Sequence, residues 1–337
     1  MNISESFQQN LQENHQLELS GLENLRKKLL FKIGFIYALC ISVSVFVFIY
    51  LLSKIYHQLK NDDEIVKVML ISCVLLLAFI ITFLYKVHKK IAHHYLYNGN
   101  YVNRYKKEII GKIIPKKFEG LTYDSQNGIP KTEFAESGFP MFQNVRRYYS
   151  SGRITGEIHK TLFSFAEVLA EEYQGSGEGG QYVDLFRGMF FIIDLKKQIS
   201  ENTLVYPDMM KYFESAIFID ENLQYKRVKL EDTEFEKQFQ VYGTDQTESR
   251  YLLSTALMSR MVNFQKKSNK YIQLSFKDSK AYLGVFGTEL FKPPVFSSVY
   301  DSNPLEGYFE NIRLMMDIVK ELNLNSRLAD SAGIKNK

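Results

Sequence analysis

Cysteine and histidine are scarce in this chain, and their positions exclude several kinds of site. Both cysteines, Cys40 and Cys73, lie inside long apolar runs, and five of the six histidines precede residue 95. A disulfide framework, a zinc site or a thiol nucleophile is therefore excluded from the rest of the chain, and we expect no metal and no cofactor there. A serine–histidine–aspartate site would need His159, which we interpret as a partly buried strand residue, with a catalytic base as the alternative.

An excess of either charge is missing from the larger part of the chain. Residues 100–337 hold 32 basic and 31 acidic residues. A balanced domain does not attract a polyanion, so no nucleic-acid partner is expected. The two apolar runs also lack acidic residues, which argues against a transporter.

Two long runs without charge predict membrane-spanning helices. The first, Ile33 to Leu52, has 20 residues and the second, Val68 to Tyr85, has 18. A hydrocarbon core of about 30 Å needs about 20 helical residues, so the predicted spans are 33–52 and 66–85 within a hairpin of residues 31–87. The alternative, a buried core helix, would show a polar stripe.

The residues before the first run predict an N-terminal amphipathic helix over residues 1–30. Its apolar positions are Phe7, Leu11, Leu22, Leu25 and Leu29. A signal peptide has only a short polar segment before its apolar core, whereas about 30 mostly polar residues precede the first run here. We therefore expect the first run to remain in the protein as an anchor.

Basic residues flank the spans and set the expected orientation. Four precede the first span and nine lie between Lys86 and Lys117, against three in and beside the connecting loop. This bias predicts a multi-pass protein of the cell (inner) membrane with both termini cytoplasmic. Residues 88–117 form a basic juxtamembrane segment next to the lipid bilayer. The expected membrane-surface residues are Lys86, Lys89, Lys90, Arg104, Lys106, Lys107 and Lys112.

Part of this basic segment has helical periodicity. Apolar side chains recur at Tyr101, Tyr105, Ile109 and Ile113. The segment either lies along the lipid headgroups as an amphipathic helix or leads into the soluble domain as an ordinary helix.

Residues 118–324 predict a soluble α+β domain with an antiparallel sheet and packed helices, followed by a flexible tail over 325–337. Alternation predicts strands at 162–171 and 182–194, and the Gly175–Gly180 stretch between them reads as a turn. The dinucleotide pattern that this stretch satisfies would require a helix after it. The remaining predicted elements are strands at 203–206, 227–230, 271–276 and 281–286, with the last two in a hairpin, and helices at 248–264 and 305–322.

Asp245, Glu248 and Arg250 form the most polar group in this domain. They are our candidate ligand or partner residues, with a guanidinium beside two carboxylates. The alternative is structural: Asp245 caps the following helix, Glu248 completes a capping box, and Arg250 ties the turn to the sheet.

Several segments resemble a bacterial membrane-protein family known as domain of unknown function 3137. They are Phe186-Arg-Gly-Met-Phe-Phe191, Phe235-Glu-Lys-Gln-Phe-Gln-Val-Tyr-Gly-Thr-Asp245, Arg250-Tyr-Leu252, Tyr105-Lys-Lys-Glu and Leu121-Thr-Tyr123. The resemblance implies a membrane-tethered bacterial domain and transfers no activity.

Two function classes follow. The first is a membrane-anchored cytoplasmic binding or scaffold module with a protein partner or a second copy of the chain, and the sparse histidine and cysteine favour it. The alternative is a carboxylate-dependent hydrolase at the membrane, which would need acids converging in a pocket.

Overall fold

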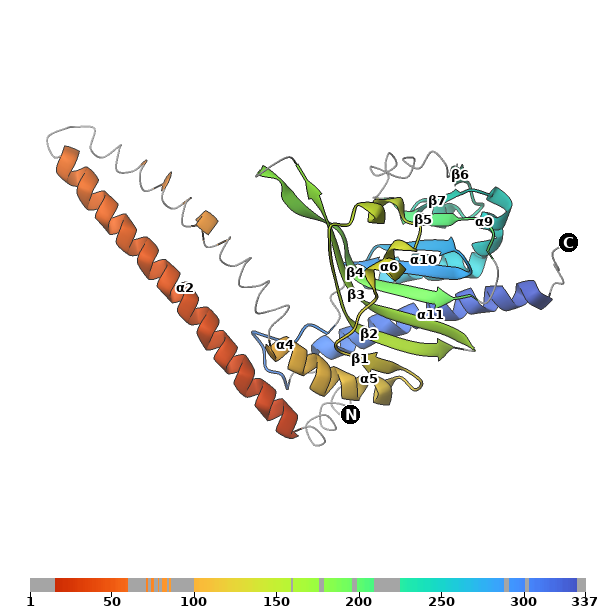
Figure 1. Cartoon of the computed structure of the whole chain (residues 1–337), viewed down its shortest axis with the longest axis horizontal. Helices are drawn as coiled ribbons and strands as arrows, with labels where there is room; N and C mark the ends of the chain where they lie inside the picture. Colours follow the sequence, from red (N-terminus) through yellow and green to blue (C-terminus); the bar gives the residue numbers. More distant parts are fainter. Residues whose placement is uncertain are drawn as a thin grey trace. The chain divides into compact units, whose positions relative to one another are not determined.

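The computed structural model describes residues 16–59, 71, 74–75, 78, 81–83, 85, 100–158, 160–175, 179–195, 199–208, 225–287, 291–300 and 303–331 (Figure 1). The chain divides into two compact units. Unit 1 comprises residues 1–105 and 292–302, and unit 2 comprises residues 106–291 and 303–337.

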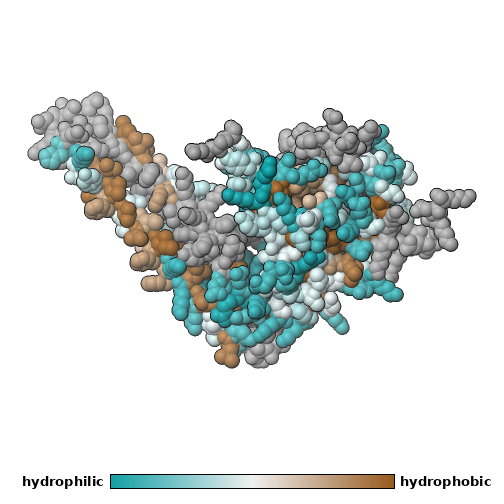
Figure 2. Space-filling view, viewed as in Figure 1, coloured by the Kyte–Doolittle hydropathy of each residue, from teal (hydrophilic) through white to brown (hydrophobic). Residues whose placement is uncertain are grey.

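Unit 1 is built around one long helix, α2 (Gln16–Leu59). The predicted amphipathic segment, from Gln16 onward, and the first predicted span are parts of this single helix. Its N-terminal part buries Leu19 and Leu22, whereas Phe35 and Phe46 in the charge-free stretch are 61% and 73% exposed. Figure 2 shows hydrophobic residues along this helix. In the part of the chain that the structure describes, α2 is the one helix long and apolar enough to cross a membrane.

The second predicted span lies mostly outside the described residues. The described positions between 71 and 85 are helical and include exposed apolar side chains such as Val74 and Tyr85. They are too few to establish a second crossing, and the two-helix hairpin stays a prediction.

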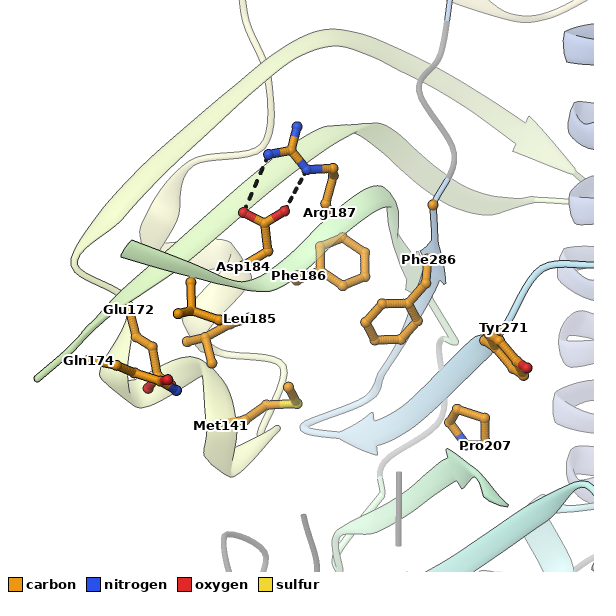
Figure 3. A pocket seen from close by; sticks show the side chains of 12 residues that line it. Met141, Glu172, Gln174, Asp184, Leu185, Phe186, Arg187, Pro207, Tyr271 and Phe286 are labelled. Carbon is orange, nitrogen blue, oxygen red and sulfur yellow. Dashed lines mark hydrogen bonds and ion pairs between the residues drawn. The ribbon is translucent and has the colours of Figure 1, made fainter. Parts of the chain in front are cut away.

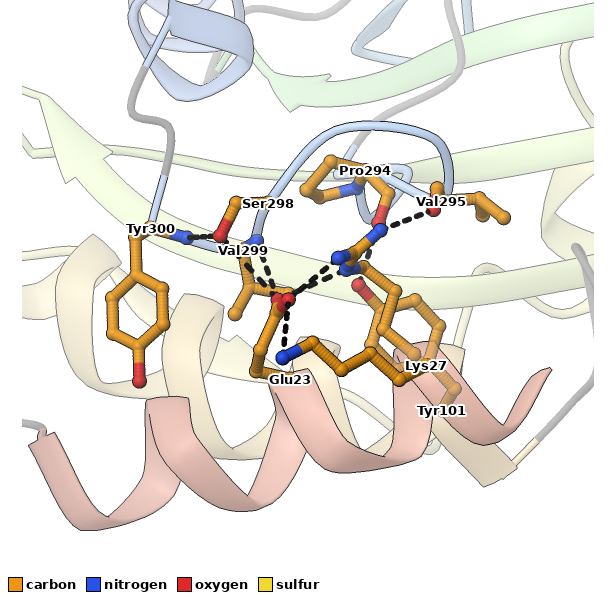
Figure 4. A network of polar contacts seen from close by, with 9 residues as sticks. Glu23, Lys27, Tyr101, Pro294, Val295, Ser298, Val299 and Tyr300 are labelled. Carbon is orange, nitrogen blue, oxygen red and sulfur yellow. Dashed lines mark hydrogen bonds and ion pairs between the residues drawn. The ribbon is translucent and has the colours of Figure 1, made fainter. Parts of the chain in front are cut away.

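A polar network holds α2 against residues 294–299 within unit 1 (Figure 4). Arg26 donates from Nε and Nη2 to Glu23, at 2.9 and 2.5 Å, and from Nη1 to the Val295 carbonyl at 2.9 Å. Glu23 also accepts the Val299 N–H at 3.2 Å. The Arg26 guanidinium holds the pKa of Glu23, which lies before the charge-free stretch, at about 2. The carboxylate therefore stays ionised, and the loop stays attached to α2, at any physiological pH.

Unit 2 contains an antiparallel sheet, which confirms the predicted α+β class. Its described strands follow the order β1-β2-β3-β4-β9-β8-β5-β7-β6. Their bounds are β1 Thr122–Asp124, β2 Arg147–Ile158, β3 Thr161–Gln174, β4 Gln181–Asp194, β5 Thr203–Pro207, β6 Lys226–Val228, β7 Phe239–Gly243, β8 Ile272–Lys277 and β9 Lys280–Phe286.

Helices cover the sheet on both faces (Figure 1). The described helices are α4 Asn100–Tyr105 (in unit 1), η2 Lys106–Ile110, α5 Gly111–Lys117, α6 Lys131–Ala135, η3 Pro140–Asn144, α8 Thr233–Glu236, α9 Gln246–Leu252, α10 Thr255–Ser268 and α11 Asn303–Ser331. Alternate side chains of β4 point to opposite faces of the sheet. Phe190 packs in the cluster with Phe134 and Phe142, and Phe191 stacks on Phe165 with 4.3 Å between ring centroids.

Both predicted hairpins are confirmed. β3 pairs antiparallel with β4 out to Gln174 and Gln181, so the glycine-rich stretch joins two strands and the dinucleotide interpretation is wrong. β8 and β9 turn at Asp278 and Ser279, which both have positive φ, as a two-residue hairpin of the favoured twist requires.

The helix predicted at 248–264 is two helices. α9 ends at Leu252, and the Ser254 hydroxyl accepts the Leu257 N–H at 3.2 Å to begin α10. A serine that caps a new helix therefore interrupts a continuous apolar pattern. At the other end of the domain, α11 continues past Asn325, where the tail was predicted to begin.

At Gly188 the backbones of β4 and β9 leave no room for a side chain. A Cβ atom on Gly188 would stand 1.8 Å from the Val285 carbonyl oxygen on β9. The sequence allowed a bulge or a close approach at this glycine, and the structure shows the close approach.

Candidate functional site

An apolar pocket of about 380 Å³ lies beside the outer part of β4 (Figure 3). This volume is within the range of small-molecule sites. Its walls come from β3, β4, β5, η3 and the ends of β8 and β9. The lining residues are Met141, Glu172, Gln174, Val183, Asp184, Leu185, Phe186, Arg187, Pro207, Tyr271, Phe286 and Gly287.

The pocket exists because β9 ends before β4 does. β9 pairs with β4 from Asp194 to Gly188, and the last bond runs from the Gly287 N–H to the Arg187 carbonyl at 2.8 Å. Beyond that point β2 still pairs with β3 as far as Glu171. From Glu172 and Val183 to Gln174 and Gln181, β3 and β4 continue as a two-stranded arm. Among the described strands, none pairs with this outer part of β4 on the side where β9 ends, and the pocket occupies that place.

Aromatic rings form the inner wall. Phe186 is buried, and its ring meets that of Phe286 edge to face, 5.0 Å between centroids. Leu185 and Phe286 pack against the buried cluster that also contains Met141. Near the pocket, burial raises the pKa of the Tyr206 phenol, so this group stays neutral.

Charged and polar groups stand at the rim. Arg187 Nε donates to Asp184 Oδ2 at 2.6 Å, and both side chains are more than a third exposed. Gln174 donates to Glu172 nearby. In Figure 3, these four residues lie around the arm, away from Pro207 and Tyr271. An apolar interior with a charged rim fits a ligand that has an apolar body and a polar head.

A second, more open depression of about 580 Å³ is lined by more charged residues than the pocket beside β4, and we call it the polar depression. Arg153 donates to Glu133 and to Ser164, both at 3.1 Å. Lys280 and Asp194 add one charge of each sign to the lining. Glu157 adds a further acid, so the lining holds three acidic side chains (Glu133, Glu157 and Asp194) against Arg153 and Lys280. Its formal net charge of −1 does not favour an anion.

The candidate residues at 245–250 make contacts within unit 2. Asp245 accepts the Glu248 N–H at 2.7 Å as the cap of α9. The Glu248 carboxylate does not close a capping box, since it accepts the Ser200 and Glu201 N–H groups instead. Arg250 donates to the Lys229 carbonyl at 3.3 Å, just after β6, as the structural alternative predicted.

Replacing Asp245 with alanine is expected to destabilise unit 2 by about 1 kcal/mol, the usual effect of losing a helix cap. Asp245→Asn should retain most of this stability, because an amide oxygen also caps. Urea denaturation of both variants measures the difference. Equal loss in both would mean that the carboxylate charge, and not the cap, matters.

The predicted membrane-surface residues have different environments. Lys106 is buried and contacts Glu167, Nζ to Oε2 2.5 Å, so its assignment to the lipid surface is wrong. Lys107 and Lys112 are exposed, and Arg104 is half-buried. Lys86, Lys89 and Lys90 lie outside the described residues.

The apolar face of residues 101–113 is buried inside the protein. Tyr101, Tyr105, Ile109 and Ile113 are each less than 5% exposed. Burial of this face in protein leaves no apolar face for the headgroups, which contradicts the headgroup alternative and supports the helix that leads into the domain.

Metal and histidine chemistry gains no support. In the part of the chain that the structure describes, no three histidine, cysteine, aspartate or glutamate residues are grouped as metal ligands would be. His159 and Cys73 lie outside that part.

The pocket was missed in the sequence, although some of its residues were noticed. Phe186 stands in a family motif, and Leu185 and Phe286 were read only as strand residues. Nothing in the sequence indicated that β9 ends opposite Arg187, because that depends on pairing between distant strands.

Comparison with known proteins finds a family match over part of the chain and indicates no activity. Residues 184–324 match the family described as protein of unknown function (DUF3137), which confirms the resemblance for the motifs from Phe186 onward. No curated protein matches the chain. The crystal structure of the mycobacterial trehalose monomycolate transport factor A, TtfA, covers 65% of this chain and 95% of its own, at 12% identity and a TM-score of 0.35. A TM-score of this size supports no argument.

Proposed function

We propose that this DUF3137-containing chain is a membrane-anchored binding module whose pocket beside β4 takes the apolar part of an amphipathic small molecule. The observation that carries the proposal is the pocket itself: an apolar volume of about 380 Å³ with Asp184 and Arg187 at its rim. Apolar walls supply affinity without requiring a reaction, and the rim supplies selectivity for the head of the ligand.

Membrane anchorage supports a ligand that is itself concentrated at the bilayer. α2 carries the charge-free stretch 33–52 with its apolar side chains exposed. The second span and the cytoplasmic side of the domain remain part of the proposal, and they rest on the run at 66–85 and on the excess of basic residues around the spans.

The alternative is a carboxylate-dependent hydrolase, and the carboxylates that it would use first are already engaged in structural contacts. Asp245 and Glu248 are occupied by backbone N–H groups. Glu133, in the polar depression, is paired with Arg153. We therefore favour binding over catalysis.

Photo-crosslinking with a diazirine-labelled fatty acid tests the pocket in full-length protein in lipid nanodiscs. Adducts mapped by mass spectrometry are expected on Met141, Leu185 or Tyr271. Leu185→Trp, which fills part of the volume, should lower these adducts about tenfold, equivalent to about 1.4 kcal/mol. Adducts on α2 provide the internal reference, because the bilayer labels them in both proteins.

Leu162→Trp is the matched control. Leu162 is 54% exposed and lines the polar depression, so this change should leave pocket labelling intact. Labelling confined to α2 in the unaltered protein, or equal loss in both variants, would contradict binding in the pocket.

A further inference from the structure

Phe296 is the most exposed aromatic residue for which unit 1 gives an exposure, at 79%. The two valines of the same loop are buried, Val295 at 7% and Val299 at 6% exposed. A single exposed apolar residue is ordinary on a protein surface. The position of this one, however, is fixed relative to the charge-free part of α2.

Hydrogen bonds to Glu23, Arg26 and Tyr101 hold the loop. Arg26 binds the Val295 carbonyl and Glu23 accepts the Val299 N–H, while Tyr101 on α4 donates to the Pro294 carbonyl at 2.6 Å. In Figure 4 the loop runs antiparallel to α2, with Val295 toward the Lys27 end and Tyr300 toward the helix N-terminus. The Val295 carbonyl is therefore bonded to Arg26, at the end of the network nearer the charge-free stretch, and Phe296 is the next residue in the sequence.

The distance along α2 is short. Ile33, where the charge-free stretch begins, is seven positions after Arg26. At about 1.5 Å per position, the helix rises about 10 Å between them. The headgroup layer on each side of the hydrocarbon core is roughly 5–8 Å thick. An extended aromatic side chain is long enough to span the remaining distance between the end of the headgroup layer and the level of Arg26.

We propose that the loop of residues 292–300 contacts the membrane interface and inserts Phe296 at the boundary between headgroups and acyl chains. Aromatic rings favour this depth. Lys27 and Lys28, exposed on the same part of α2, face the layer that holds lipid phosphates. The loop and the start of the span thus form one lipid-contacting surface in unit 1. This surface is independent of the pocket in unit 2.

The chain contains no tryptophan, so one introduced residue reports its own surroundings. The test uses full-length Phe296→Trp in vesicles of phosphatidylcholine and phosphatidylglycerol, with acrylamide as the aqueous quencher and brominated lipids as the membrane quenchers. We expect emission at short wavelength, strong quenching by lipids brominated near the headgroup, and at least threefold weaker acrylamide quenching than for Leu17→Trp.

Two matched variants, Leu17→Trp and Phe46→Trp, calibrate the result. Leu17 is 87% exposed at the far end of α2 and should report water, and Phe46 is 73% exposed within the charge-free stretch and should report deep quenching by bromine near the chain ends. If the Phe296→Trp protein behaves like the Leu17→Trp protein, the proposal is overturned. Short-wavelength emission without lipid quenching would also overturn it, because protein would then cover the loop. Failure of the Phe46→Trp protein to sense lipid would instead refute the span.

Discussion

A Gly188→Ala protein is expected to lose about 3 kcal/mol of stability or more, the largest effect of any single methyl group that we foresee in this fold. The added carbon would overlap the Val285 carbonyl oxygen at 1.8 Å and stand 2.9 Å from the carbonyl carbon. Both atoms belong to the backbone of β9, which cannot rotate away as a side chain can. β4 and β9 must separate at the point where the pocket begins.

Thermal unfolding followed by circular dichroism measures this loss, and a domain of this size should melt about 6–12 °C lower. Gly307→Ala is the matched control. Gly307 is exposed on α11 and has no atom within 4 Å of an added Cβ, so the change should be neutral or stabilising by up to about 1 kcal/mol. Similar melting of both variants would show that β4 and β9 do not pair in this register.

Replacing Lys106 with methionine is expected to destabilise unit 2 by about 2–4 kcal/mol. Lys106 Nζ lies 2.5 Å from Glu167 Oε2, and the two side chains are 10% and 22% exposed. Loss of the ammonium leaves a largely desolvated carboxylate without this opposite charge. The partial exposure of Glu167 places the effect below that of a fully buried pair.

A double-mutant cycle isolates the pair. Lys106→Met with Glu167→Gln should recover more than half of the loss, because no charge then needs compensation. Lys107→Met, one residue along and exposed, should change stability by less than about 0.5 kcal/mol. Equal effects at residues 106 and 107, measured by urea denaturation, would mean that Lys106 is solvated.

Local sequence patterns predicted the elements that local patterns control. The run 33–52 indicated the apolar part of α2, and alternation at 162–171 and 182–194 indicated the β3–β4 hairpin. β2 was missed because Gly152 and Gly156 interrupt a polar stretch. The structure places Gly152 at positive φ, in a bulge of the β2–β3 ladder. A bulge breaks the alternation on which strand prediction depends.

Lys106 was misassigned although a signal was present. It stands in a row of residues four apart with Val102, Ile110 and Ile114, and all of them are buried. The sequence interpretation used the row beginning at Tyr101 and assigned the neighbouring lysines to the membrane surface. The buried face is two rows wide, so a lysine in the second row needed a carboxylate partner, which β3 supplies from far along the chain.

Unit 1 combines an N-terminal segment with residues 292–302, so it cannot be completed until late in synthesis. Glu23 and Arg26 leave the ribosome early, but the loop that they bind is about 270 residues later. At about 5–20 residues per second, that interval lasts roughly 15–55 s. During this time α2 can enter the bilayer while its ion pair still lacks the Val295 and Val299 backbone. In its proposed role as the anchor, α2 is thus the first part of the protein to meet the membrane and among the last to be finished. Chains truncated before the loop would leave its polar network incomplete.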